Sequence, residues 1–253
     1  MQVEKRAEII ASLQSEILRL QGFRPSDNNG VDPVQGLMKD AFPNGCFPLG
    51  AVHEFLASGP EQSAASVGFI IGLLSSLIDG SGTALWISSA RTLFPPALAL
   101  FGVQPDRIIF IDLSNDKHVG WAVEEALKCG ALTAVVGEMR EMSFTASRRL
   151  QLAVEQSKVT GFILRSDARK INTTACISRW RITPLPGEAI EDLPGVGYPS
   201  WSVELLRIRN GKPGAWNLSW VNGKFEPVVD SLLERRDEYK VTSGHRQYQR
   251  KTG

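Results

Sequence analysis

Residues 55–69 read "FLASGPEQSAASVGF" and have the frame of a phosphate-binding loop. Such a loop opens with a glycine and closes with Gly-Lys-Ser or Gly-Lys-Thr, so that backbone N–H groups and the lysine meet phosphate oxygens and the hydroxyl binds Mg²⁺. Here Ala64 and Ala65 stand where the second glycine and the lysine belong. The candidate cofactor-binding residues are those of a vestigial phosphate loop: Gly59, Ser63, Ala64, Ala65 and Ser66.

The substitutions remove groups on which phosphate chemistry relies. A charge-assisted hydrogen bond from the lysine contributes about 1.5–3 kcal/mol, so affinity falls about tenfold to a hundredfold without it, and phosphoryl transfer suffers more. The two acids that such enzymes use are also altered. After the strand "LTAVVG", Glu138 comes one place later than the acid that orders Mg²⁺. The strand "TALWISS" leads into Ala90 and has no acid that could activate water. We expect a pseudo-enzyme with no catalytic residue, no metal and no cofactor, in which residual ATP and Mg²⁺ binding stays open.

A purely structural interpretation of the same stretch is also open. The residues Gly-Pro-Glu-Gln-Ser can form a polar connection between a strand and a helix that starts near Ser63. Partial matches to a short motif arise often by chance, so the motif alone does not decide between a relic and an accident.

Short apolar segments alternate with longer helical ones from Gly50 to Arg165, which is typical of parallel βαβ units. A finer alternation follows, with tight-turn signals at residues 210–211 and 222–223, and predicts antiparallel strands. We expect an α/β fold: a mostly parallel sheet flanked by helices, with antiparallel strands at its C-terminal edge. The predicted strands are 51–57, 83–88, 107–113, 132–138 and 162–165, and the predicted helices are 64–80, 95–101, 117–130 and 144–161.

The two ends of the chain differ from this pattern. Residues 4–21 have apolar side chains at steps of three and four, which predicts an amphipathic helix, and a Gly- and Pro-rich linker follows. The polar, basic end predicts a disordered tail. We therefore divide the chain into an N-terminal helix and linker (1–46), a core domain (47–229) and a basic tail (230–253), and both ends are candidate docking elements.

Bulk properties exclude several classes of protein. The 253 residues are 43% hydrophobic and 22% charged, an ordinary globular composition, and the net charge of +1 creates no global field for nucleic acid or membrane. Three scattered cysteines fit a reducing compartment. With neither a signal-peptide core nor an apolar run of transmembrane length in the sequence, we expect a cytoplasmic protein.

Basic side chains gather around the ends of the predicted strands and could touch phosphates or a partner protein, or could simply form a solvated face. The candidate DNA or partner contacts are Arg148, Arg149, Arg165, Arg169, Lys170, Arg209 and Lys212.

Other polar and aromatic residues have structural interpretations. His53 lies within an apolar strand, where a hydrogen-bonded core histidine is expected, and Ser143 is placed to cap a helix. Core packing is favoured for the tryptophans of the antiparallel part, although base stacking by them is an alternative. These tryptophans are Trp180, Trp201, Trp216 and Trp220.

Four segments in order resemble the RecA-like superfamily, which belongs to the P-loop NTPase type: "FPLGAVHEFLASGPEQSAAS", "LTAVVGEM", "TGFILRSDARK" and "ELLRIRNGKPGAWNLSW". Within that group the chain resembles the ImuA family, through "TALWISSARTLFPPAL" and "SFTASRRLQLAVEQS" as well. The resemblance implies an accessory protein of error-prone translesion synthesis in the DNA-damage (SOS) response. Its implied partners are an ImuB-like inactive Y-family polymerase, a specialised C-family DNA polymerase complex and RecA, with indirect contact to DNA and none to membrane.

Departures from the superfamily shape what is expected. The long DNA-gripping loops of recombinases are short connections here, so strand exchange is not expected. Our main hypothesis is a non-catalytic scaffold. The rivals are a slow ATPase of the RecA superfamily, in which Glu138 replaces the missing acid, and an SOS-type inhibitor of cell division.

Overall fold

A computed structural model describes residues 32–43, 45–78, 82–90, 93–166, 171–187 and 197–228, together with six residues of an N-terminal helix: Arg6, Ile9, Ile10, Ser12, Leu13 and Glu16. The basic tail lies outside the described residues, as does most of the predicted helix 4–21. Those six residues are helical and exposed, and they include an apolar stripe of Ile9, Ile10 and Leu13.

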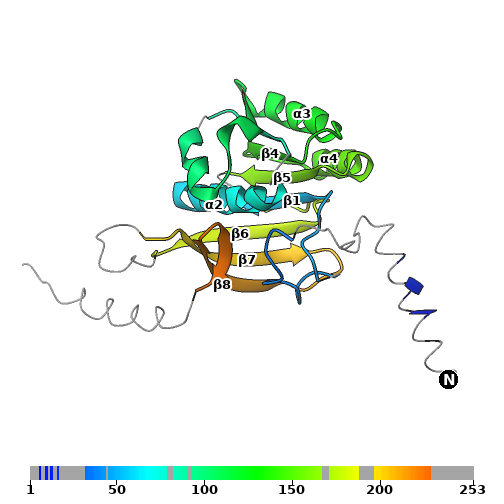
Figure 1. The fold of residues 1–253 in the computed structure, drawn as a ribbon. Helices are drawn as coiled ribbons and strands as arrows, with labels where there is room; N and C mark the ends of the chain where they lie inside the picture. The colour runs from blue at the N-terminus through cyan, green and yellow to red at the C-terminus, as the bar shows by residue number, and fades with distance from the viewer. Residues whose placement is uncertain are drawn as a thin grey trace, which may run out of the picture.

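The described strands form a single sheet in the order β3-β2-β4-β5-β1-β6-β7-β8-β9 (Figure 1). Neighbours from β3 to β6 run parallel, and β6 to β9 pair antiparallel. The mostly parallel sheet with antiparallel strands at its C-terminal edge is therefore confirmed, with the refinement that β6 pairs parallel with β1. The strands are β1 (Val52–Leu56), β2 (Ala84–Ser88), β3 (Ile108–Asp112), β4 (Ala134–Met139), β5 (Thr160–Arg165), β6 (Ser178–Leu185), β7 (Ser200–Ile208), β8 (Gly214–Val221) and β9 (Lys224–Pro227).

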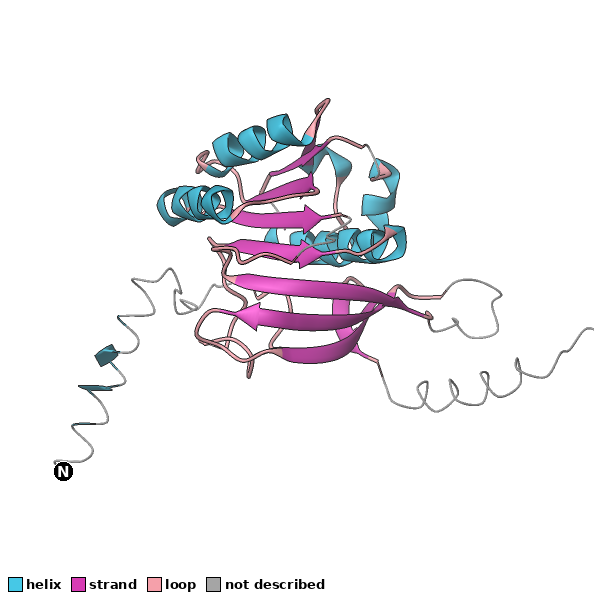
Figure 2. Ribbon diagram, turned by 180° about the vertical axis from the view of Figure 1, so that it is seen from behind, coloured by secondary structure: helices cyan, strands magenta, loops and turns pink. Residues whose placement is uncertain are grey.

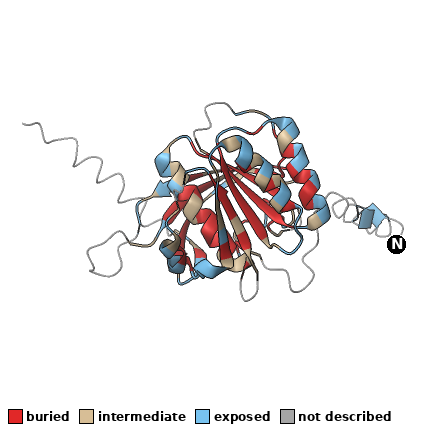
Figure 3. Cartoon of the chain, turned by 90° about the horizontal axis from the view of Figure 1, so that it is seen from above, coloured by how far each residue is buried: buried red, intermediate tan, exposed pale blue. Residues whose placement is uncertain are grey.

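Helices cover the parallel half of the sheet, as the view from behind shows (Figure 2). One apolar core lies between the sheet and α2 (Pro60–Leu77), and a second lies between the sheet and the pair α3 (Asp116–Leu127) and α4 (Phe144–Ser157). Strand β1 contributes to both, because successive side chains point to opposite faces: Phe55 joins the first core and Val52 the second. Strands β1, β4 and β5 are therefore buried along their whole length (Figure 3).

The sequence explains where these helices begin and end. The side chains of Asn115 and Ser143 accept hydrogen bonds from the backbone N–H groups of His118 and Ala146, so both residues are N-caps, as predicted for Ser143. Helix α4 ends at Lys158, which adopts the left-handed conformation with φ of 67°. Residues Pro95–Phe101, predicted as a helix, form a 3₁₀ helix that is followed by Gly102 in the left-handed conformation with φ of 76°.

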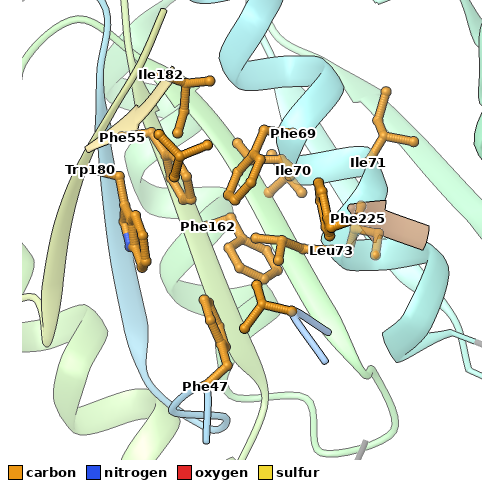
Figure 4. Close-up of a cluster of buried hydrophobic side chains, with 14 of the residues drawn as sticks. Phe47, Phe55, Phe69, Ile70, Ile71, Leu73, Phe162, Trp180, Ile182 and Phe225 are labelled. Carbon is orange, nitrogen blue, oxygen red and sulfur yellow. The ribbon is translucent and has the colours of Figure 1, made fainter. Parts of the chain in front are cut away.

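Aromatic side chains fill the core under α2 (Figure 4). Trp180 stacks on Phe55 with ring centroids 6.2 Å apart, and Phe69 packs against Phe225 at 4.9 Å. Trp180, Trp201 and Trp220 are buried here, which confirms core packing for these three, and Trp216 is half-buried and packs against the same core. The predicted linker contributes as well, because Val34, Met38 and Phe42 lie in this core.

His53 is a buried member of a hydrogen-bonded chain, as predicted. Its Nε2 lies 2.7 Å from the carbonyl oxygen of Pro48, so Nε2 carries the proton, and its Nδ1 accepts from the Ser178 hydroxyl at 2.7 Å. That hydroxyl accepts in turn from the indole of Trp180 at 2.7 Å. Burial lowers the pKa of His53 from 6.5 to about 3.

We predict that His53 makes the fold sensitive to mild acid. Below pH 6.5 the unfolded histidine binds a proton, whereas the folded one stays neutral down to about pH 3. The free energy of unfolding should therefore drop by about 1.2 kcal/mol between pH 7.0 and 5.5. Urea titrations should show this loss in the native protein and in the exposed control His118→Gln, but not in His53→Gln. Equal losses in native protein and His53→Gln would contradict the prediction.

Candidate functional site

The expected phosphate loop is helical. Helix α2 starts at Pro60, directly after an extended Gly59 with φ of −169° and ψ of 178°. The N–H of Ser63 donates to the carbonyl of Gly59 at 3.0 Å, and residues 63–66 lie inside the helix. Their backbone N–H groups are used within α2 and do not form the open cradle that a phosphate requires.

Local sequence accounts for this early helix start. A proline at the first helical position has a preset φ, and alanine at position 64 lacks the freedom that a glycine would give to an open loop. The carboxamide oxygen of Gln62 accepts from the N–H of Ser58 at 3.0 Å, which satisfies a donor in front of the helix. The helix therefore begins before Ser63, where the structural interpretation had placed its start.

The hydroxyl expected to bind Mg²⁺ is inaccessible. Ser66 is fully buried, and its Oγ has no hydrogen-bond partner among the described residues. Ala65 is also buried, so a lysine at this position would have to leave the core. Of the five predicted cofactor-binding residues, only Ala64 is well exposed.

The two residues expected at the metal-binding end of β4 face opposite sides of the sheet. A Cβ built on Gly137 would lie 2.5 Å from Cγ2 of Val123 in α3, so this position points away from α2. Glu138 lies on the side of α2, is buried, and accepts from Nε1 of Trp86 at 2.6 Å. Glu138, and not Gly137, is therefore the strand-end residue on the face of the expected loop.

A second acid reaches the strand ends from α3, and the sequence pattern did not reveal it. Asp116 accepts from the hydroxyl of Ser89 at 3.1 Å and from the N–H of Arg140 at 3.2 Å. It thereby joins the end of β2 to the end of β4. Ala90 stands where an acid would activate water, and it is exposed beside this contact.

The strongest electrostatic feature is a buried ion network in the middle of β1. Glu54 is fully buried, and its carboxylate accepts from Nη1 of Arg165 at 2.9 Å and from Nε of Arg179 at 2.7 Å. The hydroxyl of Thr174 donates to the same carboxylate at 2.9 Å. Both guanidinium groups also donate to Asn172, through its side chain and its backbone oxygen, and these bonds satisfy N–H groups that the carboxylate does not reach.

This network holds the crossover that connects β5 to β6 across β1. Arg207 donates to the carbonyls of Thr174 and Cys176 at 3.1 and 2.8 Å, while Arg209 donates to that of Ala175 at 3.0 Å. Ser147 of α4 accepts from the N–H of Ala175 at 2.9 Å. The described residues 171–177 of the crossover contain no helix, so side chains from α4, β6 and the end of β7 satisfy their backbone.

Burial under the crossover also makes Cys176 inert. Desolvation raises the pKa of this thiol to about 12, with a further contribution from the Glu54 carboxylate. A neutral, buried thiol is neither a nucleophile nor a metal ligand near neutral pH. Within the described residues, no three His, Cys, Asp or Glu side chains are grouped so that they could hold a metal ion.

The structure separates the predicted basic contacts into three groups. Arg165 and Arg209 are committed to the crossover, and Arg149 pairs with Glu124 of α3 at 2.6 Å. Arg148 and Lys212 are exposed and have no ion pair among the described residues. Arg169 and Lys170 lie outside the described residues.

The sequence reasoning singled out Arg165 but missed its pairing with Glu54, for which the sequence carries a recognisable signal. Glu54 is a lone acid inside the apolar run Val-His-Glu-Phe-Leu, and Arg165 ends the apolar run Phe-Ile-Leu-Arg. Opposite charges inside two buried strands must be paired, because an isolated charge is almost never fully buried. That rule points to the pair, although it does not say that the two strands are neighbours.

Together the fold and these strand ends define an α/β protein with a central mixed sheet. A helix occupies the position of the expected phosphate loop, and a buried ion network fixes the crossover after β5. None of the described helices combines the length and the apolar character needed to span a membrane.

Comparison with known proteins gives the family. The chain is 35% identical over 214 residues to Protein ImuA of Caulobacter vibrioides strain NA1000, a match that covers 80% of this chain and 88% of the relative. Protein ImuA of the Caulobacter vibrioides strain CB 15 gives the same 35% identity. No protein-family model matches the chain. The chain belongs to the ImuA family.

We predict that Glu54→Gln strongly destabilises the protein. The substitution removes the carboxylate that Arg165 and Arg179 share, and removing one partner of a buried pair costs about 3–5 kcal/mol. The half-exposed pair Arg181 and Glu204 gives a matched control, since Glu204→Gln should cost less than about 1 kcal/mol. Guanidinium titrations measure both. Similar small losses in the two variants would refute a central role for Glu54.

We also predict that an aspartate introduced at Gly137 destabilises the fold and creates no Mg²⁺ site. Its Cβ would collide with Val123, and its charge would enter the apolar core under α3, at a cost of about 3 kcal/mol or more. Ala90→Asp, at an exposed strand end, should change stability by no more than about 0.5 kcal/mol. Thermal unfolding with and without Mg²⁺ tests this: stabilisation of Gly137→Asp by the metal would be the contrary result.

Proposed function

We propose that this chain is a non-catalytic, RecA-like accessory protein of error-prone translesion synthesis in the DNA-damage response. Membership of the ImuA family supports a place in the ImuA/ImuB mutagenesis system. In this proposal the chain docks an ImuB-like inactive Y-family polymerase, assists a specialised C-family polymerase complex and modulates RecA. Contact with DNA is indirect.

The order of parts in the fold supports the RecA-like assignment. A central strand leads into a helix, a later strand ends in an acid on the same side of the sheet, and an antiparallel hairpin ends in a basic turn. Asn210 in that turn has φ of 59°, and the N–H of Lys212 donates to the carbonyl of Ala41 at 3.0 Å. The turn is thereby fixed to the protein's own body.

One observation carries the non-catalytic part of the proposal: α2 starts at Pro60. Phosphoryl transfer needs precise positioning and electrostatic stabilisation of the phosphate groups. Here the backbone donors are used in the helix, the hydroxyl of Ser66 is buried, and the carboxylate of Glu138 is engaged by Trp86. Both the geometry and the charges of a nucleotide site are altered.

The short connections at the strand ends support a role through protein contacts. The crossover after β5 is tied down by arginines that a DNA-binding loop would instead present to phosphates. Arginines that donate to backbone carbonyls fix the described part of this surface, residues 171–177. A preorganised surface of this kind suits a scaffold, because binding then costs little ordering.

The proposal predicts a stable complex between the full-length protein and the ImuB-like protein encoded in the same organism. Copurification and size-exclusion chromatography of the two purified proteins should give one comigrating species, with no ATP turnover. Versions lacking residues 1–22 or 230–253 serve as matched variants, and loss of the complex in one of them would place the contact on that end.

Three results would contradict the proposal. The first is failure of the two full-length proteins to associate. The second is ATP hydrolysis that Ser66→Ala abolishes, which would favour the slow ATPase. The third is filamentation of cells on overproduction together with direct binding to the tubulin-like division protein, which would favour a division inhibitor.

A further inference from the structure

The outer surface of α4 carries an uncovered stripe that no contact described above uses. Phe144 and Leu152 are 49% and 48% exposed, although both are large apolar residues. Arg148 lies between them, and Glu155 follows on the same side of the helix. At 100° per residue the four directions fall within about 80° of one another, so they form one stripe along the helix.

The two charges of the stripe have no ion-pair partner in the part of the chain that the structure describes. Arg148 and Glu155 are exposed, and neither has an ion pair among the described residues. The neighbouring Arg149, by contrast, is held by Glu124 of α3. Seven residues separate Arg148 from Glu155, about 10.5 Å along the axis, which is too far for them to pair with each other.

The stripe is held on a rigid support. Ser143 caps the first turn, and Ser147 donates to the carbonyl of Phe144 at 2.7 Å and accepts from Ala175 of the crossover at 2.9 Å. One turn further, the side chain of Gln151 accepts from the N–H of Val52 in β1 at 3.3 Å. The exposed stripe therefore does not need to be ordered before it can bind.

An additional apolar residue lies beside the start of the stripe. Ile171 in the crossover is 56% exposed. The next residue, Asn172, donates to the carbonyl of Met142 at 2.8 Å, just ahead of the first turn of α4. The uncovered surface thus has apolar groups at one end, a cation, a central leucine and an anion at the other end.

Two copies of this stripe in antiparallel orientation are complementary, because the cation of one copy faces the anion of the other. In an antiparallel pair of α4 helices centred on Leu152, each Arg148 meets the Glu155 of the other copy, and the two leucines meet in the middle. Phe144 then lies just beyond the C-terminal end of the opposite helix, because it is about 12 Å from the centre and α4 ends at Ser157. Such a contact is isologous and closes on itself, so it gives a dimer without a filament.

We infer that α4 is the contact surface of a two-fold homodimer, with a second copy of this chain as its occupant. The inference goes beyond the proposed function and does not depend on it. The surface is small compared with a standard interface, so the dimer should be weak, with a dissociation constant in the micromolar range or above. Opposite charges at both ends of the central leucine set the antiparallel register.

Sedimentation velocity of the full-length protein, from low micromolar to near-millimolar concentration, tests the inference. The native protein should shift from monomer to dimer over this range. Leu152→Asp should abolish the shift, because it places two carboxylates at the centre of the interface. Trp121→Asp, at another exposed apolar residue on α3, is the matched control and should leave the shift unchanged.

A charge exchange identifies the register. Arg148→Glu and Glu155→Arg should each weaken dimerisation by about tenfold or more, since each brings like charges together. The double variant with both exchanges should recover native dimerisation, because the pairs are restored with reversed sign. A protein that stays monomeric at all concentrations, or a dimer that these variants do not affect, would overturn the inference.

Discussion

The buried carboxylate of Glu54 is the constraint on which the rest of the structure depends. A charge in the middle of the central strand is tolerated only if donors surround it, and here Arg165, Arg179 and Thr174 do so. These donors come from the strands on either side of β1 and from the crossover that passes over it. One acid thus holds three neighbouring strands together and fixes the described part of the crossover, residues 171–177.

That constraint separates the two faces of the protein by role. The face under α2 is an aromatic core in which the expected nucleotide groups are covered, because α2 starts at Pro60 and Trp86 engages Glu138. The face under α3 and α4 contains the ion network and presents a firm outer surface. On the first face, the start of α2 takes the place of an open phosphate cradle. In our proposal, the second face offers other proteins a surface.

Much of the fold could be predicted from sequence, because β1 to β5 and their helices obey strong periodic patterns and have clear caps. Contacts between side chains that are far apart in the sequence could not be predicted. Asp116 lies on a helix and contacts the end of β2, while Arg207 contacts a crossover more than thirty residues away in sequence. At the candidate site, a motif of spaced residues predicted Gly59 and Ser66, but spacing cannot tell an open loop from a helix that starts four residues early. The proline at position 60 was the local signal that decided the question.

Amide hydrogen exchange at residues 57–66, measured with and without Mg²⁺ and ATP, tests the central claim most directly. A helix from Pro60 predicts slow exchange at Ala64, Ala65 and Ser66 in the free protein, because their N–H groups are bonded within α2. Addition of millimolar nucleotide should leave these rates unchanged. Fast exchange in the free protein that becomes slow on addition of Mg²⁺ and ATP would contradict the account, because it would reveal an open loop that a phosphate orders.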